Sequence, residues 1–120
     1  MNHAAAVITK IDHAVSQLED ATLNLGELDP AEMTHHEQWM LACRIAMLAG
    51  YVQQMSASLS SRISDGPKPS GRGDREALSL ARSQLVEVVV KVGALRVTLA
   101  SAAESLDTIR VHPGTGESEG

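Results

Sequence analysis

Glutamate and histidine side chains cluster in the first half of the chain with a spacing compatible with metal binding. Glu32 and His35 lie three residues apart, and His36 and Glu37 follow directly. On a helix, residues three apart share a face, and Glu-x-x-His pairs supply ligands in helix-bundle carboxylate–metal sites. Such sites need ligands from several helices, and the chain has no second Glu-x-x-His, although a dimer would duplicate this one. We therefore favour a solvated helix start, where acidic residues suit the helix dipole, over a metal site.

Other residue types that carry chemistry are present without the arrangement that catalysis needs. The only cysteine, Cys43, stands among apolar residues and has no histidine placed beside it by the sequence, so we interpret it as a small hydrophobic residue. The sequence contains no glycine-rich phosphate loop, nucleophile elbow, HExxH or paired CxxC. We therefore expect a protein that is not an enzyme and needs no cofactor.

Composition narrows the classes of partner. The net charge is -5, and the ten Lys and Arg residues are scattered, which argues against nucleic acid and against a basic membrane-binding face. No apolar run approaches the ~20 residues that span a bilayer. The single cysteine and the lack of a signal-peptide pattern favour a cytoplasmic location. An excess of Arg over Lys, with abundant Ala, Val and Gly, suggests a bacterial or phage genome.

Apolar spacing predicts an all-α fold. The strongest pattern lies in the last third of the chain, where apolar residues alternate at steps of three and four, as in coiled-coil seams. It predicts a helix over about 74–110. Its seam comprises Leu78, Ala81, Leu85, Val88, Val92, Leu95, Leu99, Ala102, Leu106 and Ile109.

Two earlier stretches carry the same kind of spacing. The first predicts a helix over about 4–25, which ends at Gly26, and the second predicts a helix over about 30–63, which Asp29 and Pro30 begin. Residues 64–73 form a Pro- and Gly-rich loop, and residues 113–120 form a tail that we expect to be disordered. The seams of these helices comprise Ala4, Ile8, Ile11, Val15, Leu18, Thr22 and Leu25, and then Leu41, Ile45, Leu48, Val52, Met55 and Leu59.

The expected architecture is a single helical domain over residues 1–112. It is an antiparallel three-helix bundle, or a long helical hairpin with coiled-coil-like packing plus a shorter N-terminal helix. Helix one is too short to cover the whole hairpin, so the end near Pro67, with Met55 and Leu59, keeps only two helices. The third helix also has a second apolar stripe, opposite its seam, formed by Val86, Val90, Gly93 and Val97.

These exposed stripes predict protein partners. Our hypothesis is that two copies associate through the Pro67 end and the Val86–Val97 stripe as a homodimer. Alternatively, the first helix buries this stripe within one chain. Trp39, with the apolar residues Met40 and Met47 on the second helix, is a plug for one end of the bundle or a second partner face.

The function predicted from these features is that of a non-catalytic interaction, assembly or regulatory protein that binds itself and another protein. One alternative is a metal-binding bundle that uses Glu32, His35 and His36. A second alternative is an export-linked helical hairpin, because size, helical content and acidity resemble the small proteins of type VII secretion. The chain departs from that group in its central loop, which lacks Trp-x-Gly, and at Tyr51, which is followed four residues on by Met55 rather than by an acid.

Overall fold

The computed structural model describes residues 3–111 and confirms the all-α fold class. Over these residues it contains three α-helices and one short 3-10 helix, and no strand. The chain forms two compact units, one that ends at Thr34 and one that starts at His35. The predicted tail, residues 113–120, lies outside the described residues. The single domain over residues 1–112 stays a prediction.

The first unit consists of α1 (His3–Glu27) and the 3-10 helix η1 (Pro30–Glu32). Helix α1 runs two residues past its predicted end at 25, and every residue in it is exposed. Its apolar stripe is therefore solvent-accessible, with Ile8 58% and Val15 55% exposed. The predicted helix start at Pro30 yields only η1, in which the backbone N–H of Asp29 donates to Glu32 Oε1 at 3.0 Å.

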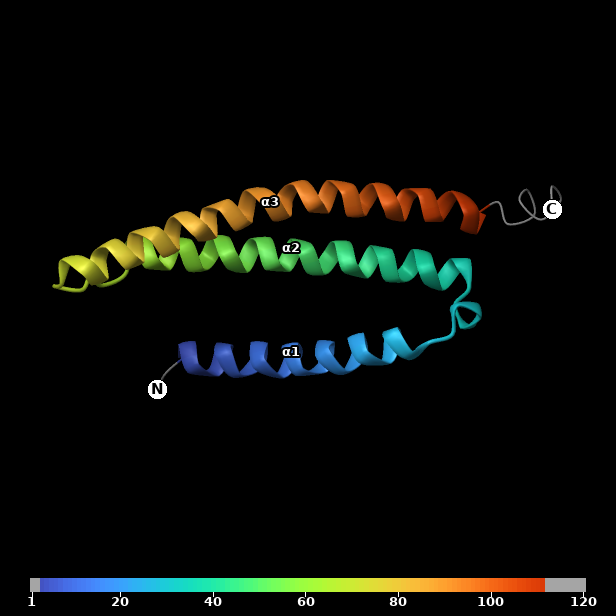
Figure 1. The fold of residues 1–120 in the computed structure, drawn as a ribbon, viewed down its shortest axis with the longest axis horizontal. Helices are drawn as coiled ribbons and strands as arrows, with labels where there is room; N and C mark the ends of the chain where they lie inside the picture. The colour runs from blue at the N-terminus through green and yellow to red at the C-terminus, as the bar shows by residue number, and fades with distance from the viewer. Residues whose placement is uncertain (1–2, 112–120) are drawn as a thin grey trace. The chain divides into compact units, whose positions relative to one another are not determined.

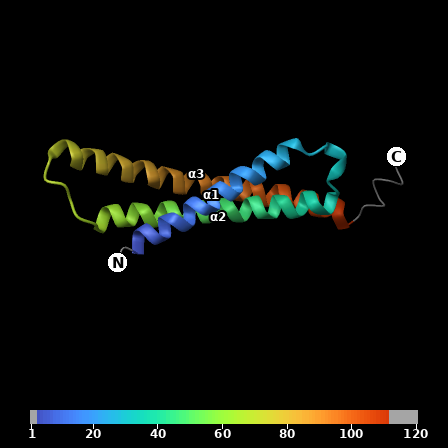
Figure 2. The same ribbon diagram turned by 90° about the horizontal axis from the view of Figure 1, so that it is seen from below.

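The second unit is a long antiparallel hairpin of α2 (His35–Asp65) and α3 (Arg72–Val111) (Figure 1). A view turned by 90° shows the same two helices joined by one loop at the end of the hairpin (Figure 2). The loop is shorter than the predicted residues 64–73, because both helices extend into it. Lys68 ends α2 by donating from Nζ to the carbonyl oxygens of Ile63 at 3.1 Å and Ser64 at 2.7 Å.

Helix α2 packs against α3 through small and polar side chains, which differs from the expected seam. In the predicted seam, Leu48 is 38% and Leu59 51% exposed, and only Leu41 is half-buried. The physical reason is that small side chains let two helix backbones approach closely, whereas leucines would hold them apart. The buried Gly50 lies beside one line of buried or half-buried α2 residues that recurs along the hairpin at steps of three and four: Ala42, Ala46, Ala49, Gln53, Ser56, Ser60 and Ile63.

Helix α3 uses half of its predicted seam in the hairpin. One column of residues spaced seven apart is half-buried, and most of the neighbouring column is exposed, including Leu95 at 58%. The half-buried column comprises Leu78, Leu85, Val92, Leu99 and Leu106. The heptad spacing therefore predicted the helix and one of the two columns expected to be buried correctly. It also assigned the neighbouring column to the interior, and most of that column is exposed.

A polar clamp fastens the middle of the hairpin. Gln53 on α2 donates from Nε2 to the Val89 carbonyl oxygen at 3.0 Å, and its Oε1 accepts from Arg96 at 2.8 Å. Two glycines make room for these side chains. A Cβ on Gly93 would lie 2.7 Å from Gln53 Nε2, and one on Gly50 would lie 3.2 Å from Arg96 Nε. Gly50 thus leaves room on α2 for the Arg96 side chain of α3.

The hairpin has almost no interior. Among the described residues, Ala103 is the only buried hydrophobic residue, at 7% exposure, and no large side chain is fully buried. Even the leucines that α3 turns toward α2 stay partly exposed. A two-helix contact alone leaves the hairpin with little of the apolar burial that normally stabilises a fold.

Substitution by alanine is predicted to have different effects on stability at the two glycines. Gly50→Ala is expected to raise the free energy of unfolding by up to about 1 kcal/mol, because alanine favours helix and the exposed Arg96 head can move aside. Gly93→Ala gains the same propensity but displaces the Gln53 amide, which costs a hydrogen bond worth about 1 kcal/mol, so little net gain is expected. Urea unfolding followed by circular dichroism, at one protein concentration, measures both. Equal stabilisation by the two substitutions would contradict the clamp.

Candidate interaction surfaces

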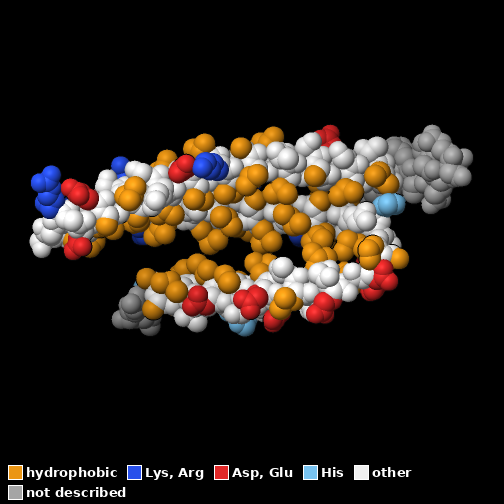
Figure 3. All heavy atoms as spheres, in the orientation of Figure 1, with side chains coloured by type: hydrophobic (Ala, Val, Ile, Leu, Met, Phe, Trp, Pro, Cys, Tyr) orange, Lys and Arg blue, Asp and Glu red, His pale blue; other side chains and the backbone are white. Residues whose placement is uncertain are grey.

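The candidate site of this protein is a set of exposed apolar surfaces on the hairpin. Figure 3 shows hydrophobic side chains, in orange, distributed along both α2 and α3. On α2, a stripe with steps of three and four residues is 38–51% exposed outside its half-buried first member, Leu41. We call it the α2 stripe, and its members are Leu41, Ile45, Leu48, Val52, Met55 and Leu59.

The α3 helix adds a column beside its contact with α2. Leu95 is 58%, Ile109 45% and Val88 36% exposed, and Ala102 between them is also exposed. Ala81, seven residues before Val88, is half-buried. These residues recur every seven positions, so they share one side of the helix. We call Ala81, Val88, Leu95, Ala102 and Ile109 the α3 column.

The predicted second stripe of α3 is a separate exposed surface. Val97 is 71%, Val90 67% and Val86 49% exposed, and Gly93 lies half-buried between them. We call these four residues the valine surface. A shallow hollow adjoins it, lined by Ala46, Met47, Gln53, Gly93, Arg96, Val97 and Ala100. Val97 and Val90 are the most exposed of the four, and Val97 lines the hollow together with Met47 of α2.

The predicted second partner face on α2 is partly exposed. Met40 is 41% and Met47 45% exposed, and Arg44 donates to the Met47 sulfur at 3.4 Å. Trp39 is half-buried, and its ring centroid lies 5.5 Å from that of His36. The tilted ring pair is a contact within one turn of α2, while the methionines remain accessible.

The structure separates the candidate metal ligands into different elements. Glu32 belongs to η1, where it accepts the Asp29 N–H, while His35 and His36 belong to the first turn of α2. His35 Nδ1 lies 3.0 Å from Gln38 Oε1 within the same turn. In residues 3–111, no group of three or more His, Cys, Asp or Glu side chains is arranged to hold a metal ion. Cys43 is a half-buried free thiol.

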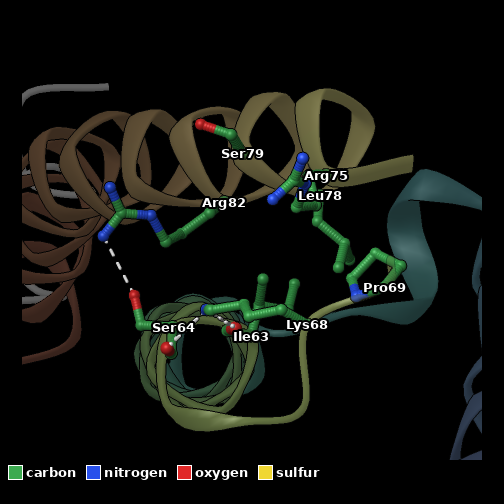
Figure 4. A pocket seen from close by; sticks show the side chains of 8 residues that line it. All are labelled: Ile63, Ser64, Lys68, Pro69, Arg75, Leu78, Ser79 and Arg82. Atoms are coloured by element: carbon green, nitrogen blue, oxygen red, sulfur yellow. Dashed lines mark hydrogen bonds between the residues drawn. The ribbon is translucent and has the colours of Figure 1, made fainter. Parts of the chain in front are cut away.

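A basic hollow at the loop end of the hairpin was not predicted from the sequence. Figure 4 shows Lys68 and Arg82 reaching toward Ser64 from the loop and from α3. Lys68 binds the carbonyls that end α2, and Arg82 donates to Ser64 Oγ at 2.9 Å. These cations therefore have a structural role, because they close the end of α2 and join it to α3. The hollow is lined by Ile63, Ser64, Lys68, Pro69, Arg75, Leu78, Ser79 and Arg82.

Charged pairs mark part of the solvated surface of α3. Lys91 Nζ lies 2.8 Å from Glu87 Oε1, and Arg72 Nε lies 3.2 Å from Glu76 Oε1, each one helical turn apart and well exposed. The hydrogen bond from Lys91, and then its positive charge, lower the pKa of the Glu87 carboxyl below its ordinary value. Polar pairs of this kind belong on a surface that stays in water.

The Glu87–Lys91 pair yields a pH-dependent prediction. Because the folded-state pKa of Glu87 is lowered, the pair's contribution is present above the unfolded-state pKa and is lost as the pH falls through the folded-state value. Lys91→Met is expected to return the pKa of Glu87 toward its ordinary value, and an NMR titration of the Glu87 side chain measures this. Arg72→Met is the control and should leave it unchanged. An unaltered pKa in Lys91→Met would show that the pair is absent in solution.

Among the described residues, no helix has an apolar stretch long enough to cross a membrane. Set against protein-family models, curated proteins and solved structures, the chain finds no match in any of the three.

Proposed function

We propose that this chain is a non-catalytic helical interaction protein that acts as a homo-oligomer through exposed helix faces and also binds another protein. The observation that supports the proposal is that many large apolar side chains are exposed while the hairpin buries almost none. Large aliphatic side chains such as Leu59 and Val97 are more than half exposed, yet Ala103 is the only buried hydrophobic residue among those described. Contiguous exposed apolar surface of this kind marks interfaces.

The exposed surfaces differ in character, which supports two kinds of contact. The α2 stripe carries long side chains, among them Met55 and Leu59, with the reach to interdigitate with another helix. The valine surface is flatter, because Val86, Val90 and Val97 are short and β-branched and Gly93 adds no side chain. Both remain proposed surfaces for self-association or a partner, and the methionines Met40 and Met47 extend the proposed partner surface on α2.

The role of the protein in this proposal is assembly or regulation. A helical hairpin with aliphatic faces recognises other helices by packing an apolar stripe into a groove, without any group that reacts. The charge distribution adds to this picture, since residues 35–111 hold nine Lys or Arg and seven Asp or Glu, a net charge of +2. Near-neutral surfaces of this kind allow apolar association with little charge repulsion.

The solution mass tests the proposal. Sedimentation of the wild-type chain at tens of micromolar is expected to give twice the mass of one chain, with dissociation on dilution, because burial of the exposed aliphatic side chains drives association. A stable monomer at that concentration would refute self-association.

A substitution on the valine surface then assigns its role. Val90→Glu introduces a charge at the centre of this surface, and Thr98→Glu introduces the same charge at an exposed position of α3 outside it. A folded monomer in Val90→Glu alone makes the valine surface the site of self-association. An unchanged mass in both variants leaves the valine surface for a different protein.

A further inference from the structure

The α2 stripe and the α3 column lie on the same side of the hairpin. Successive residues of a helix are rotated by about 100° around its axis. Followed in this direction of rotation, the α2 stripe lies about a quarter turn before the α2 residues that face α3. The α3 column likewise lies about a quarter turn before the α3 residues that face α2. Because the helices are antiparallel, the same rotational offset brings both to one side. We call this combined surface the aliphatic face. The valine surface, about a quarter turn after the contact line, lies on the opposite side.

The two parts of the aliphatic face have their midpoints at the same height along the hairpin. The α2 stripe is centred on position 50, since Leu48 and Val52 lie equally far on either side of it. The α3 column is centred on Leu95. Two contacts between the helices show which residues lie at the same height along the hairpin. The Arg96 side chain fills the space above Gly50, and Arg82 donates a hydrogen bond to Ser64. Position 50 of α2 therefore lies beside about position 96 of α3.

Matched midpoints are what a two-fold axis perpendicular to the helices requires. Such an axis pairs each helix with its own copy, antiparallel, and must pass through the centre of both contacts at once. Leu41 then meets Leu59 of the other copy, and Leu48 meets Val52, so every pair is aliphatic. A two-fold axis parallel to the helices would impose no such condition on the midpoints.

Charges at the border of the α2 stripe favour the same arrangement. Glu37 and Arg62 lie along one edge of the stripe, near its two ends and nearly equally far from position 50. In antiparallel pairing, residues on the same edge meet, so Glu37 of each copy approaches Arg62 of the other. In parallel pairing, the same edge of the two copies falls on opposite sides of the contact, so these opposite charges would not meet. The charges at the border of the stripe are thus complementary in the antiparallel arrangement.

The area of the aliphatic face is sufficient for a stable dimer. At 1.5 Å per residue, the α3 column from Ala81 to Ile109 is about 42 Å long, the α2 stripe from Leu41 to Leu59 is about 27 Å long, and each helix is about 9 Å wide. Their combined area, roughly 620 Å² on each copy, is within the roughly 600–1,000 Å² per partner of a standard protein interface. One further hairpin therefore covers the face.

We propose that the aliphatic face is the docking surface for a second copy of this chain, and that the two hairpins form an antiparallel four-helix dimer whose two-fold axis passes beside Leu95. This inference rests on the self-association proposed above and adds its surface and direction. It assigns the valine surface, on the outside of the four-helix dimer, to a different protein. The α3 column then packs on its own copy as the α2 stripe does.

A disulfide placed on the axis tests this geometry. Residues on a two-fold axis face their own copies, and helices packed 8–10 Å apart bring facing Cα atoms to about 5 Å, within the range of a disulfide. The variant is Leu95→Cys in the full chain, with Cys43→Ala removing the natural thiol. Its matched control is Val90→Cys in the same background, at a position that is also exposed, at 67%, but lies on the valine surface.

The expected result is a covalent dimer of the Leu95→Cys chain under mild oxidation, formed at least about tenfold faster than that of Val90→Cys, as seen on non-reducing denaturing gels. Faster linkage of Val90→Cys would overturn the assignment of the face while leaving self-association intact. Slow linkage of both, with a dimeric wild type, would overturn the axis. Slow linkage of both, with a monomeric wild type, would refute self-association itself and leave the face to another segment or partner.

A second pair of variants tests the same proposal without cysteine substitutions, in case a cysteine variant misfolds. Leu48→Gln removes an aliphatic side chain next to the centre of the α2 stripe, and Ser58→Gln places the same residue at an exposed position of α2 outside the stripe. Leu48→Gln is expected to raise the dimer dissociation constant at least about tenfold relative to Ser58→Gln, with equal helix content by circular dichroism. Equal dissociation constants would contradict the proposal.

Discussion

The close contact between the small-residue side of α2 and α3 is the constraint on which the rest of the structure depends. Ala46, Ala49 and Ser60 bring the two helices together, and the Gln53 clamp fixes their relative height. Small side chains gain little apolar burial for each contact, so this seam defines the geometry of the hairpin more than it contributes to its stability. The leucines, isoleucine and valine of α2 that would contribute more lie to one side of it.

That division explains why the aliphatic residues are exposed, and exposure is the basis of the proposed function. A hairpin that used Leu48 and Leu59 internally would have a fuller interior and a polar outside. With alanines and serines inside, the aliphatic residues remain on the surface, and their burial requires another molecule or another segment. The same reasoning makes the polar pairs of α3 informative, because Glu87 and Lys91 mark a side that no apolar partner would cover.

The sequence predicted the helices well and their packing less well, for a physical reason. Steps of three and four place residues on one side of a helix, and this fixed the existence of α1, α2 and α3. The size of the apolar side chains identifies the most hydrophobic side of a helix. However, Ala49 and Leu48 both belong to regular lines of residues along α2, and the spacing alone does not show which line contacts α3. Sequence reasoning therefore assigned the valines of α3, with Met55 and Leu59, to a surface, in agreement with their exposure, yet it placed Ile45 and Leu48 in the seam between the helices. The contacts of Gln53 and Arg82 bring together residues that local spacing does not relate.

The distribution of charge explains why the hairpin, rather than α1, is suited to pair with a second copy. Residues 3–34 hold one Lys and six Asp or Glu, a net charge of -5, whereas residues 35–111 have a net charge of +2. Pairing two copies through α1 would concentrate like charge, and this repulsion weakens only as salt screens it. The apolar stripe of α1, with Ile8 and Val15 exposed, lies in this acidic part of the chain. Association of the hairpins meets much less repulsion, so apolar burial can decide it.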